Sequence, residues 1–205
     1  MLETKLIPAA QGDSKRLMIV LHGLGDSMAG YAWVPQALRF PWLNYLLVNA
    51  PDDYHGGFSW YEYDGDAATG VRRSIKLLNE LLDAQRAAGF PTEQTVLFGF
   101  SQGCLMTLET GLRYPHRFAA LMGSSGYVLA PETLRGEAPP IAKEQRVLVT
   151  HGRQDPLIPC ADVKRQVEEL QAGGLALTWR EFDKIHTISE EEIVVLRRFI
   201  EESFA

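Results

Sequence analysis

This sequence has few cysteines, no long apolar run and no excess of positive charge. Its two cysteines, Cys104 and Cys160, are too few among 205 residues for the disulfide framework of a small secreted protein. No stretch approaches the roughly 18 consecutive apolar residues of a membrane-spanning helix, and residues 1–16 lack the apolar core of a signal peptide. A net charge of −6, with no offsetting basic cluster, argues against a nucleic-acid partner. We therefore expect a cytoplasmic protein with free thiols and no stable membrane insertion.

Apolar runs typical of buried strands alternate with segments of helical spacing along the whole chain. This alternation predicts a mostly parallel sheet with helices on both faces, and the length predicts one domain spanning residues 1–205. The segments 51–66 and 124–145 are expected as loops, with no large cap. We expect strands at 16–23, 44–51, 95–100, 117–126, 146–152 and 175–182, and helices at 66–89, 102–115, 161–174 and 189–202.

The stretch GFSQG at 99–103 joins the expected strand 95–100 to the helix 102–115. In this context G-x-S-x-G is typical of a nucleophilic serine on a sharp strand-to-helix turn. Gly99 and Gly103 would leave room where strand and helix cross, and the helix N-terminus would favour a developing oxyanion. Ser101 is therefore the candidate nucleophile. The alternative is a helix-capping serine in a glycine-rich turn.

A serine hydroxyl needs a base, and in folds of this kind an acid and then a histidine follow the serine. Among five histidines, only His186 lies after a suitable acid downstream of Ser101, between the last expected strand and helix. Asp155, just after a strand, can accept a hydrogen bond from the imidazole and orient it. Asp183 is the other candidate, but the pleat of the last strand would direct its side chain. We predict Asp155 as the acid.

Two backbone N–H groups are needed to stabilise the oxyanion of an acyl-transfer reaction. One belongs to the residue after the nucleophile, which is Gln102. The other is expected from the loop HGLGD at 22–26, which follows the first long strand, and Leu24 is the best candidate. We expect His22 to brace this loop rather than to take part in the chemistry.

These motifs together resemble the phospholipase/carboxylesterase family of α/β-hydrolases, which includes acyl-protein thioesterases and small bacterial carboxylesterases. LHGLGDS combined with GFSQG is the most specific feature, and the segment GGFSWYEYD at 56–64 resembles the Trp-containing segment that borders the family's acyl site. The resemblance spans almost the whole chain in the right order. Its stretches are LHGLGDS at 21–27, AAGFPTEQTVLFGFSQG at 87–103, HGRQDPLIP at 151–159 and HTISEEE at 186–192.

The resemblance implies the α/β-hydrolase fold and hydrolysis of short- to medium-chain carboxylic esters, and also of thioesters in some members. It implies a Ser101–His186–Asp155 triad with Leu24 and Gln102 as oxyanion donors, the residues chosen above. It implies no metal, no cofactor, small-molecule ester or thioester substrates, and a tendency to form homodimers. The alternative from another class is a catalytically silent binding protein on a hydrolase scaffold, which the presence of all three triad residues disfavours.

Four aromatic residues in loops after neighbouring strands are candidates for the acyl groove, namely Phe58, Trp60, Tyr61 and Tyr127. Ordinary packing of loops against the core explains each of them equally well, so they are weak candidates. Because the 51–66 segment is too short for a large lid, we expect an open site that suits short soluble esters.

Two positions depart from the family pattern. Cys104 stands where the family usually has a second glycine, one turn into the helix after the nucleophile, and we interpret it as core filler. Ile185 stands where the family usually has glycine, directly before the histidine. A β-branched residue cannot take every loop conformation open to glycine, so the loop that carries His186 is expected to follow a different path.

Overall fold

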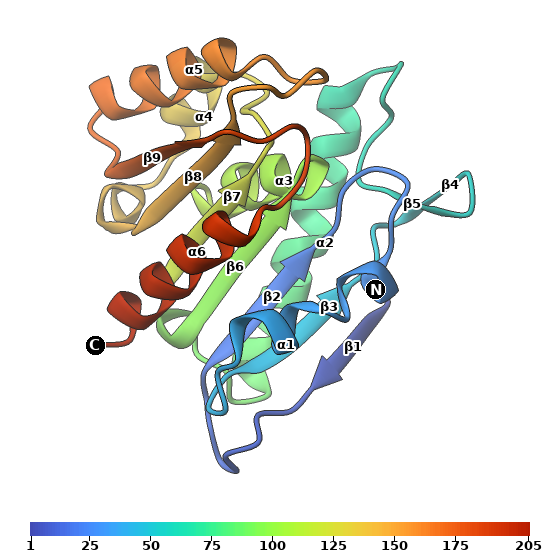
Figure 1. Ribbon diagram of the computed structural model, residues 1–205, viewed down its shortest axis with the longest axis vertical. Coiled ribbons are helices and arrows are strands. Elements are labelled where there is room, and N and C mark those ends of the chain that lie inside the picture. The colour runs from blue at the N-terminus through green and yellow to red at the C-terminus, as the bar shows by residue number, and fades with distance from the viewer.

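The computed structural model describes residues 1–205 and is organised around a seven-stranded sheet (Figure 1). All neighbouring strands are parallel except β1, which runs antiparallel to β3 at one edge. The sheet order is β1-β3-β2-β6-β7-β8-β9. The strands are β1 Thr4–Ile7, β2 Leu17–Leu21, β3 Asn44–Val48, β6 Thr95–Phe100, β7 Ala120–Ser124, β8 Val147–Gly152 and β9 Leu177–Phe182.

Helices cover both faces of the sheet because its central strands are apolar on both faces. In β2, Leu17 and Ile19 belong to one apolar cluster, whereas Met18 and Val20 belong to a second cluster on the opposite face. Helices α1 Val34–Leu38 and α6 Glu190–Ser203 cover the second cluster and lie in front of the sheet in Figure 1. The first cluster is covered by α2 Ala67–Ala87, α3 Gln102–Gly111, α4 Pro131–Glu137 and α5 Cys160–Ala172.

The six strands and four helices expected from the sequence are all present, so the predicted α/β architecture is confirmed. The helix expected over 102–115 ends earlier, at Gly111. Elements too short to show a periodic pattern were missed, notably β1, α1 and α4. The 51–66 segment forms a small hairpin, β4 Asp52–Tyr54 and β5 Gly57–Ser59, with no large cap, and three short 3₁₀ helices complete the chain at Met28–Tyr31, Thr92–Gln94 and Pro140–Glu144.

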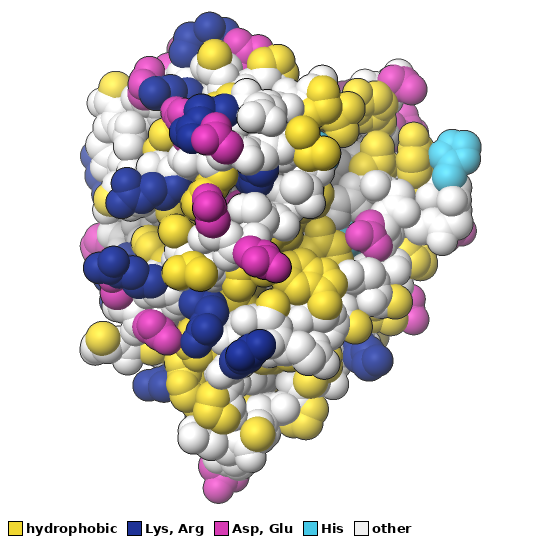
Figure 2. All heavy atoms as spheres, in the orientation of Figure 1, with side chains coloured by type: hydrophobic (Ala, Val, Ile, Leu, Met, Phe, Trp, Pro, Cys, Tyr) yellow, Lys and Arg dark blue, Asp and Glu magenta, His cyan; other side chains and the backbone are white.

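On the face shown in Figure 2, Lys and Arg side chains are interspersed with Asp and Glu and form no continuous basic patch. None of the helices combines the length and the apolar character needed to cross a bilayer.

The crossing of β2, β6 and α3 places the turn at residue 101. A Cβ added to Gly99 would lie 1.9 Å from the carbonyl oxygen of Gly103, and one added to Gly103 would lie 2.2 Å from the carbonyl oxygen of Leu21. Backbone therefore packs directly on backbone at this point. Any side chain would separate helix from strand and displace the turn between them.

This packing predicts that Gly99→Ala destabilises the protein by about 3 kcal/mol, since neither backbone contact can move without overpacking the core. Gly136, in α4, is the matched control because a Cβ there meets nothing within 4 Å. Gly136→Ala should raise the free energy of unfolding by about 0.5–1 kcal/mol. Urea unfolding of both variants measures these changes, and equal stabilities would contradict the close crossing.

Candidate active site

Ser101 occupies the turn between β6 and α3 in a backbone conformation that is rare for a residue with a side chain. Its φ and ψ are 55° and −117°, and its N–H donates to the carbonyl oxygen of Ser124 at 2.9 Å. Strain of this kind persists only where the surrounding structure holds it. Here the glycine contacts and the bond to the end of β7 hold the hydroxyl at the carboxyl edge of the sheet, over the N-terminus of α3.

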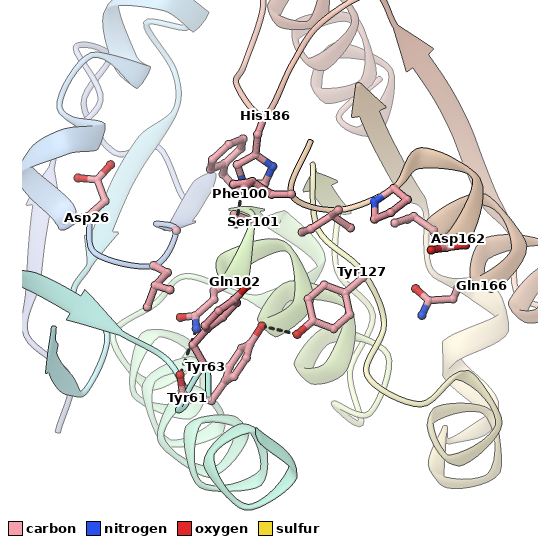
Figure 3. Close-up of a pocket in the computed structure, with 16 residues that line it drawn as sticks. Asp26, Tyr61, Tyr63, Phe100, Ser101, Gln102, Tyr127, Asp162, Gln166 and His186 are labelled. Carbon is pink, nitrogen blue, oxygen red and sulfur yellow. Dashed lines mark hydrogen bonds between the residues drawn. The ribbon is translucent and has the colours of Figure 1, made fainter. Parts of the chain in front are cut away.

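The structure brings His186 and Asp155 to this hydroxyl in one hydrogen-bonded chain. His186 Nε2 lies 2.9 Å from Ser101 Oγ, and His186 Nδ1 lies 2.7 Å from Asp155 Oδ2. Figure 3 shows His186 directly over Ser101, beside Phe100. The Phe100 ring packs against the imidazole with centroids 5.0 Å apart. The three polar residues come from the ends of β6, β8 and β9.

Asp155 is buried and its carboxylate is fully engaged. Its Oδ1 accepts from the N–H groups of Leu157 at 2.9 Å and Ile158 at 3.0 Å, while Oδ2 faces His186. Burial alone would raise the pKa of Asp155, but the bonds from Ile158, His186 and Leu157 outweigh it and hold the pKa below its usual value. An ionised Asp155 requires a proton on His186 Nδ1, which leaves the Nε2 lone pair for the serine hydroxyl.

Asp183 lies outside this arrangement. Its exposed side chain pairs with Arg153 at 2.9 Å. It lies one residue beyond the end of β9, and its side chain is in solvent. The structure therefore places Asp155, and not Asp183, against His186.

His151 is a second histidine beside Asp155, and the sequence reading assigned it no role. Its Nε2 lies 2.9 Å from the carbonyl oxygen of Ile158 and 3.4 Å from Asp155 Oδ2. Burial lowers the pKa of His151, which favours a neutral ring that donates from Nε2. The ring stacks on Trp179, and its bond to Ile158 supports the Asp155 loop. In the sequence, the sign of this role was the position of His151 four residues before Asp155, in HGRQD.

Leu24 and Gln102 both line the pocket beside Ser101. The Leu24 N–H has no acceptor within the protein, and the Gln102 N–H begins α3, where no earlier helical carbonyl can reach it. Gly23 brings the Leu24 loop close, since a Cβ there would lie 3.2 Å from Ser101 Cβ. The Gln102 side chain is itself anchored, accepting from the Trp60 N–H at 3.0 Å.

His22 braces the Leu24 loop from behind, as its position suggested. The Ala50 N–H donates to His22 Nε2 at 3.0 Å, so Nδ1 carries the proton and donates to the Gly23 carbonyl oxygen at 2.6 Å. Burial lowers the pKa of His22, which favours the same neutral form. The ring is wholly buried and does not reach Ser101.

The pocket beside Ser101 has a volume of about 550 Å³. Of the four aromatic candidates, Tyr61 and Tyr127 line it, and their hydroxyls hydrogen-bond to each other at 3.1 Å (Figure 3). Trp60 does not line it, because its ring is buried in the core and donates to the His22 carbonyl oxygen at 2.9 Å. Phe58 does not line it either. It exchanges backbone hydrogen bonds with residues 25 and 26 and so supports the Leu24 loop.

An apolar part of the pocket wall was not anticipated from the sequence. It is formed by the segment between β8 and α5 and by the first turn of α5. In the sequence, the apolar stretch PLIP that follows Asp155 indicated it. Leu157 is 69% exposed although it is apolar. This wall consists of Leu157, Ile158, Pro159 and Val163.

The two departures from the family pattern have physical explanations. Cys104 is fully buried against Gly123 and Gly126, and burial raises the pKa of its thiol to about 12, so it is protonated core filler and not a nucleophile. Ile185 points outward, 57% exposed, and its φ is not positive. The loop therefore carries His186 to Ser101 without the conformation that would require glycine.

A sequence model described as Phospholipase/Carboxylesterase matches residues 2–204. The chain belongs to the phospholipase/carboxylesterase family. Acyl-protein thioesterase 1 of Schizosaccharomyces pombe is 32% identical over 200 residues, covering 89% of this chain and 88% of the relative. Acyl-protein thioesterase 1 of Kluyveromyces lactis is 32% identical over 177 residues, 76% of this chain and 78% of that protein. Membership in the family makes this chain a hydrolase of ester or thioester bonds.

Solved structures agree with the family assignment. The crystal structure of esterase PE8 is similar with a TM-score of 0.87 at 28% identity, over 98% of both chains. A carboxylesterase of Bacillus cereus, at 17% identity and a TM-score of 0.85, covers all of this chain and 95% of its own, and shows the fold alone. The α/β-hydrolase fold without a large cap is therefore confirmed.

The contacts of the two acids predict different effects of removing their charges. Asp155→Asn should lower kcat by about 10³–10⁴-fold, because the amide favours the wrong histidine tautomer. Asp183→Asn removes only an exposed ion pair and should leave kcat within about twofold of wild type. Hydrolysis of p-nitrophenyl butyrate by both variants measures this, and equal losses would contradict the assignment of Asp155.

Proposed function

We propose that this protein hydrolyses short- to medium-chain carboxylic esters, and thioesters as a second class, through an acyl-enzyme formed on Ser101. The observation that carries the proposal is the continuous chain of hydrogen bonds from Ser101 through His186 to Asp155. In this proposal Ser101 is the nucleophile, His186 the general base and acid, and Asp155 the group that orients the imidazole.

In the first step, His186 Nε2 takes the hydroxyl proton as Ser101 Oγ attacks the carbonyl carbon. The negative charge that develops on the carbonyl oxygen is stabilised by the Leu24 and Gln102 N–H groups, which have no competing partner within the protein or the helix. His186 then gives its proton to the departing alkoxide or thiolate. In the second step water attacks the acyl-enzyme by the same proton transfers, releasing the acid and free Ser101.

The pocket supports an apolar acyl group of limited length. Tyr61 and Tyr127 line it together with Leu157 and its apolar neighbours. A volume of about 550 Å³ lies within the range of small-molecule sites. Thioesters enter the proposal because the relatives from S. pombe and K. lactis are acyl-protein thioesterases, and because His186 can give its proton to a departing thiolate as well as to an alkoxide.

Three further expectations are part of the proposal. One domain over residues 1–205 is supported by strands from both ends of the chain sharing one sheet. A cytoplasmic location is supported by the free thiols of Cys104 and Cys160. Homodimer formation is supported by the family resemblance alone.

Covalent labelling tests the nucleophile. A fluorophosphonate should add to Ser101 of the wild-type protein and be located there by peptide mass, because the activated hydroxyl attacks phosphorus as it attacks a carbonyl. Ser101→Ala should take up no adduct and lose esterase activity by about 10⁶-fold. A folded wild-type protein without an adduct at Ser101 would instead indicate the silent binding protein.

A series of p-nitrophenyl esters tests the acyl group. We expect kcat/KM to be highest for short to medium chains and to fall for palmitoyl esters, because a pocket of about 550 Å³ limits the length of the acyl chain. Steady growth of kcat/KM up to long chains would contradict the limited pocket. Matched thioesters of the same acyl chains, followed by thiol release, measure the preference between the two classes.

A further inference from the structure

Lys184 carries a buried ammonium group two residues before His186. Lysine is almost never buried unless it is paired, yet only 3% of this side chain is exposed. Its three N–H bonds have three good acceptors. They are the carbonyl oxygen of Thr187 at 2.6 Å, Ser125 Oγ at 3.0 Å and Glu192 Oε2 at 2.5 Å. The group is therefore fully satisfied.

Glu192, the buried partner of this ammonium, lies in the first turn of α6. Ser189 and Glu192 form a capping box, in which each side chain binds the backbone N–H of the other residue. The carboxylate does more than cap the helix. Its Oε1 accepts from Ser124 Oγ at 2.6 Å and also from the hydroxyl of Thr150, so it joins α6 to the ends of β7 and β8.

Two hydrogen bonds hold the turn that carries His186. Within the backbone, the Thr187 N–H donates to the Ile185 carbonyl oxygen at 2.8 Å. The Lys184 ammonium donates a second hydrogen bond, to the Thr187 carbonyl oxygen. Residues on both sides of His186 are thereby tied to a buried ion pair. The exposed Ile185 side chain takes no part in holding this turn.

The same lysine also meets the other two loops of the site. Its carbonyl oxygen accepts from the Gln154 N–H at 3.2 Å, next to Asp155. Its ammonium reaches the Ser124–Ser125 corner, where the Ser124 carbonyl oxygen accepts from the Ser101 N–H. One residue therefore contacts the histidine turn, the acid loop and the strand end that holds the nucleophile.

We propose that Lys184 is a positioning residue, whose buried ammonium sets the turn 184–187 so that His186 stays aligned with Ser101 and Asp155. It touches no reacting atom and acts only through His186. The inference rests on the proposed function, because alignment matters only if His186 transfers the serine proton. A neutral apolar side chain at 184 would leave both the Thr187 carbonyl and the Glu192 carboxylate without this donor.

The first variant, Lys184→Met, combines two effects that must be separated. It removes the bond to Thr187, and it leaves Glu192 buried without a counter-charge, which is strongly destabilising. The double variant Lys184→Met with Glu192→Gln removes both charges and keeps an amide that suits a capping box. It should recover most of the lost melting temperature. Lys76→Met, at an exposed lysine on α2, is the control for losing one positive charge.

We expect kcat for p-nitrophenyl butyrate to fall about 10- to 100-fold in Lys184→Met and to remain as low in the double variant, with KM nearly unchanged. The control should match the wild type. Rates are divided by the fraction of molecules that finally take up fluorophosphonate, so partial unfolding does not imitate a loss. If kcat returns to the wild-type value together with stability in the double variant, Lys184 is only structural and the inference is overturned.

If the double variant does not fold, Ser125→Ala provides the test, since it removes one acceptor and keeps the ion pair. It should lower kcat about threefold at unchanged KM, and an unchanged kcat would overturn the inference. The wild-type reaction separates the two proposals. A wild type without an adduct at Ser101 defeats the proposed function, whereas a reactive wild type with fully active Lys184 variants defeats only the role of Lys184.

Discussion

The close packing of β2, β6 and α3 is the constraint on which the site depends. Because Gly99 and Gly103 have no side chains, the backbone of α3 lies directly on the backbone of two neighbouring strands. The chain must then reverse within one residue, and Ser101 takes the strained conformation that this requires. Its hydroxyl is presented at the edge of the sheet, and the first N–H groups of α3 lie beneath it. The position of the nucleophile is thus a consequence of how closely a helix can approach a sheet.

The remaining polar groups are arranged by the parallel order of the strands. Parallel strands end at the same edge, so Asp155 after β8 and His186 after β9 arrive beside Ser101 after β6. Each of the three loops around Ser101 is supported by a buried polar side chain or ion pair. His22 supports the Leu24 loop, His151 the Asp155 loop, and the Lys184–Glu192 pair the His186 turn. Burial favours neutral rings for the two histidines, so they brace the loops as hydrogen-bonding groups without adding charge.

The pocket combines this polar centre with apolar walls of different origin. Tyr61 follows the small hairpin, Tyr127 follows β7, and Leu157 and Ile158 follow the acid. The two N–H groups that bind Asp155 belong to the same Leu157 and Ile158, so one short segment both holds the acid and lines the pocket. A change in this segment to alter substrate preference would therefore also disturb the support of Asp155.

Local patterns in the sequence were sufficient for the alternation of strands and helices, for the nucleophile turn, and for the order of Ser101, Asp155 and His186, because each depends on neighbours along the chain. Only the tertiary structure could show that Tyr61 lines the pocket while Trp60 is buried in the core. The two are adjacent aromatic residues in one loop, so the sequence gives no sign of which one faces the pocket. The tertiary structure also decided that Ile185 faces solvent and that Lys184 lies buried against Glu192. Such pairings join residues from different elements, and the energy of burying a charge depends on partners that are distant in the chain.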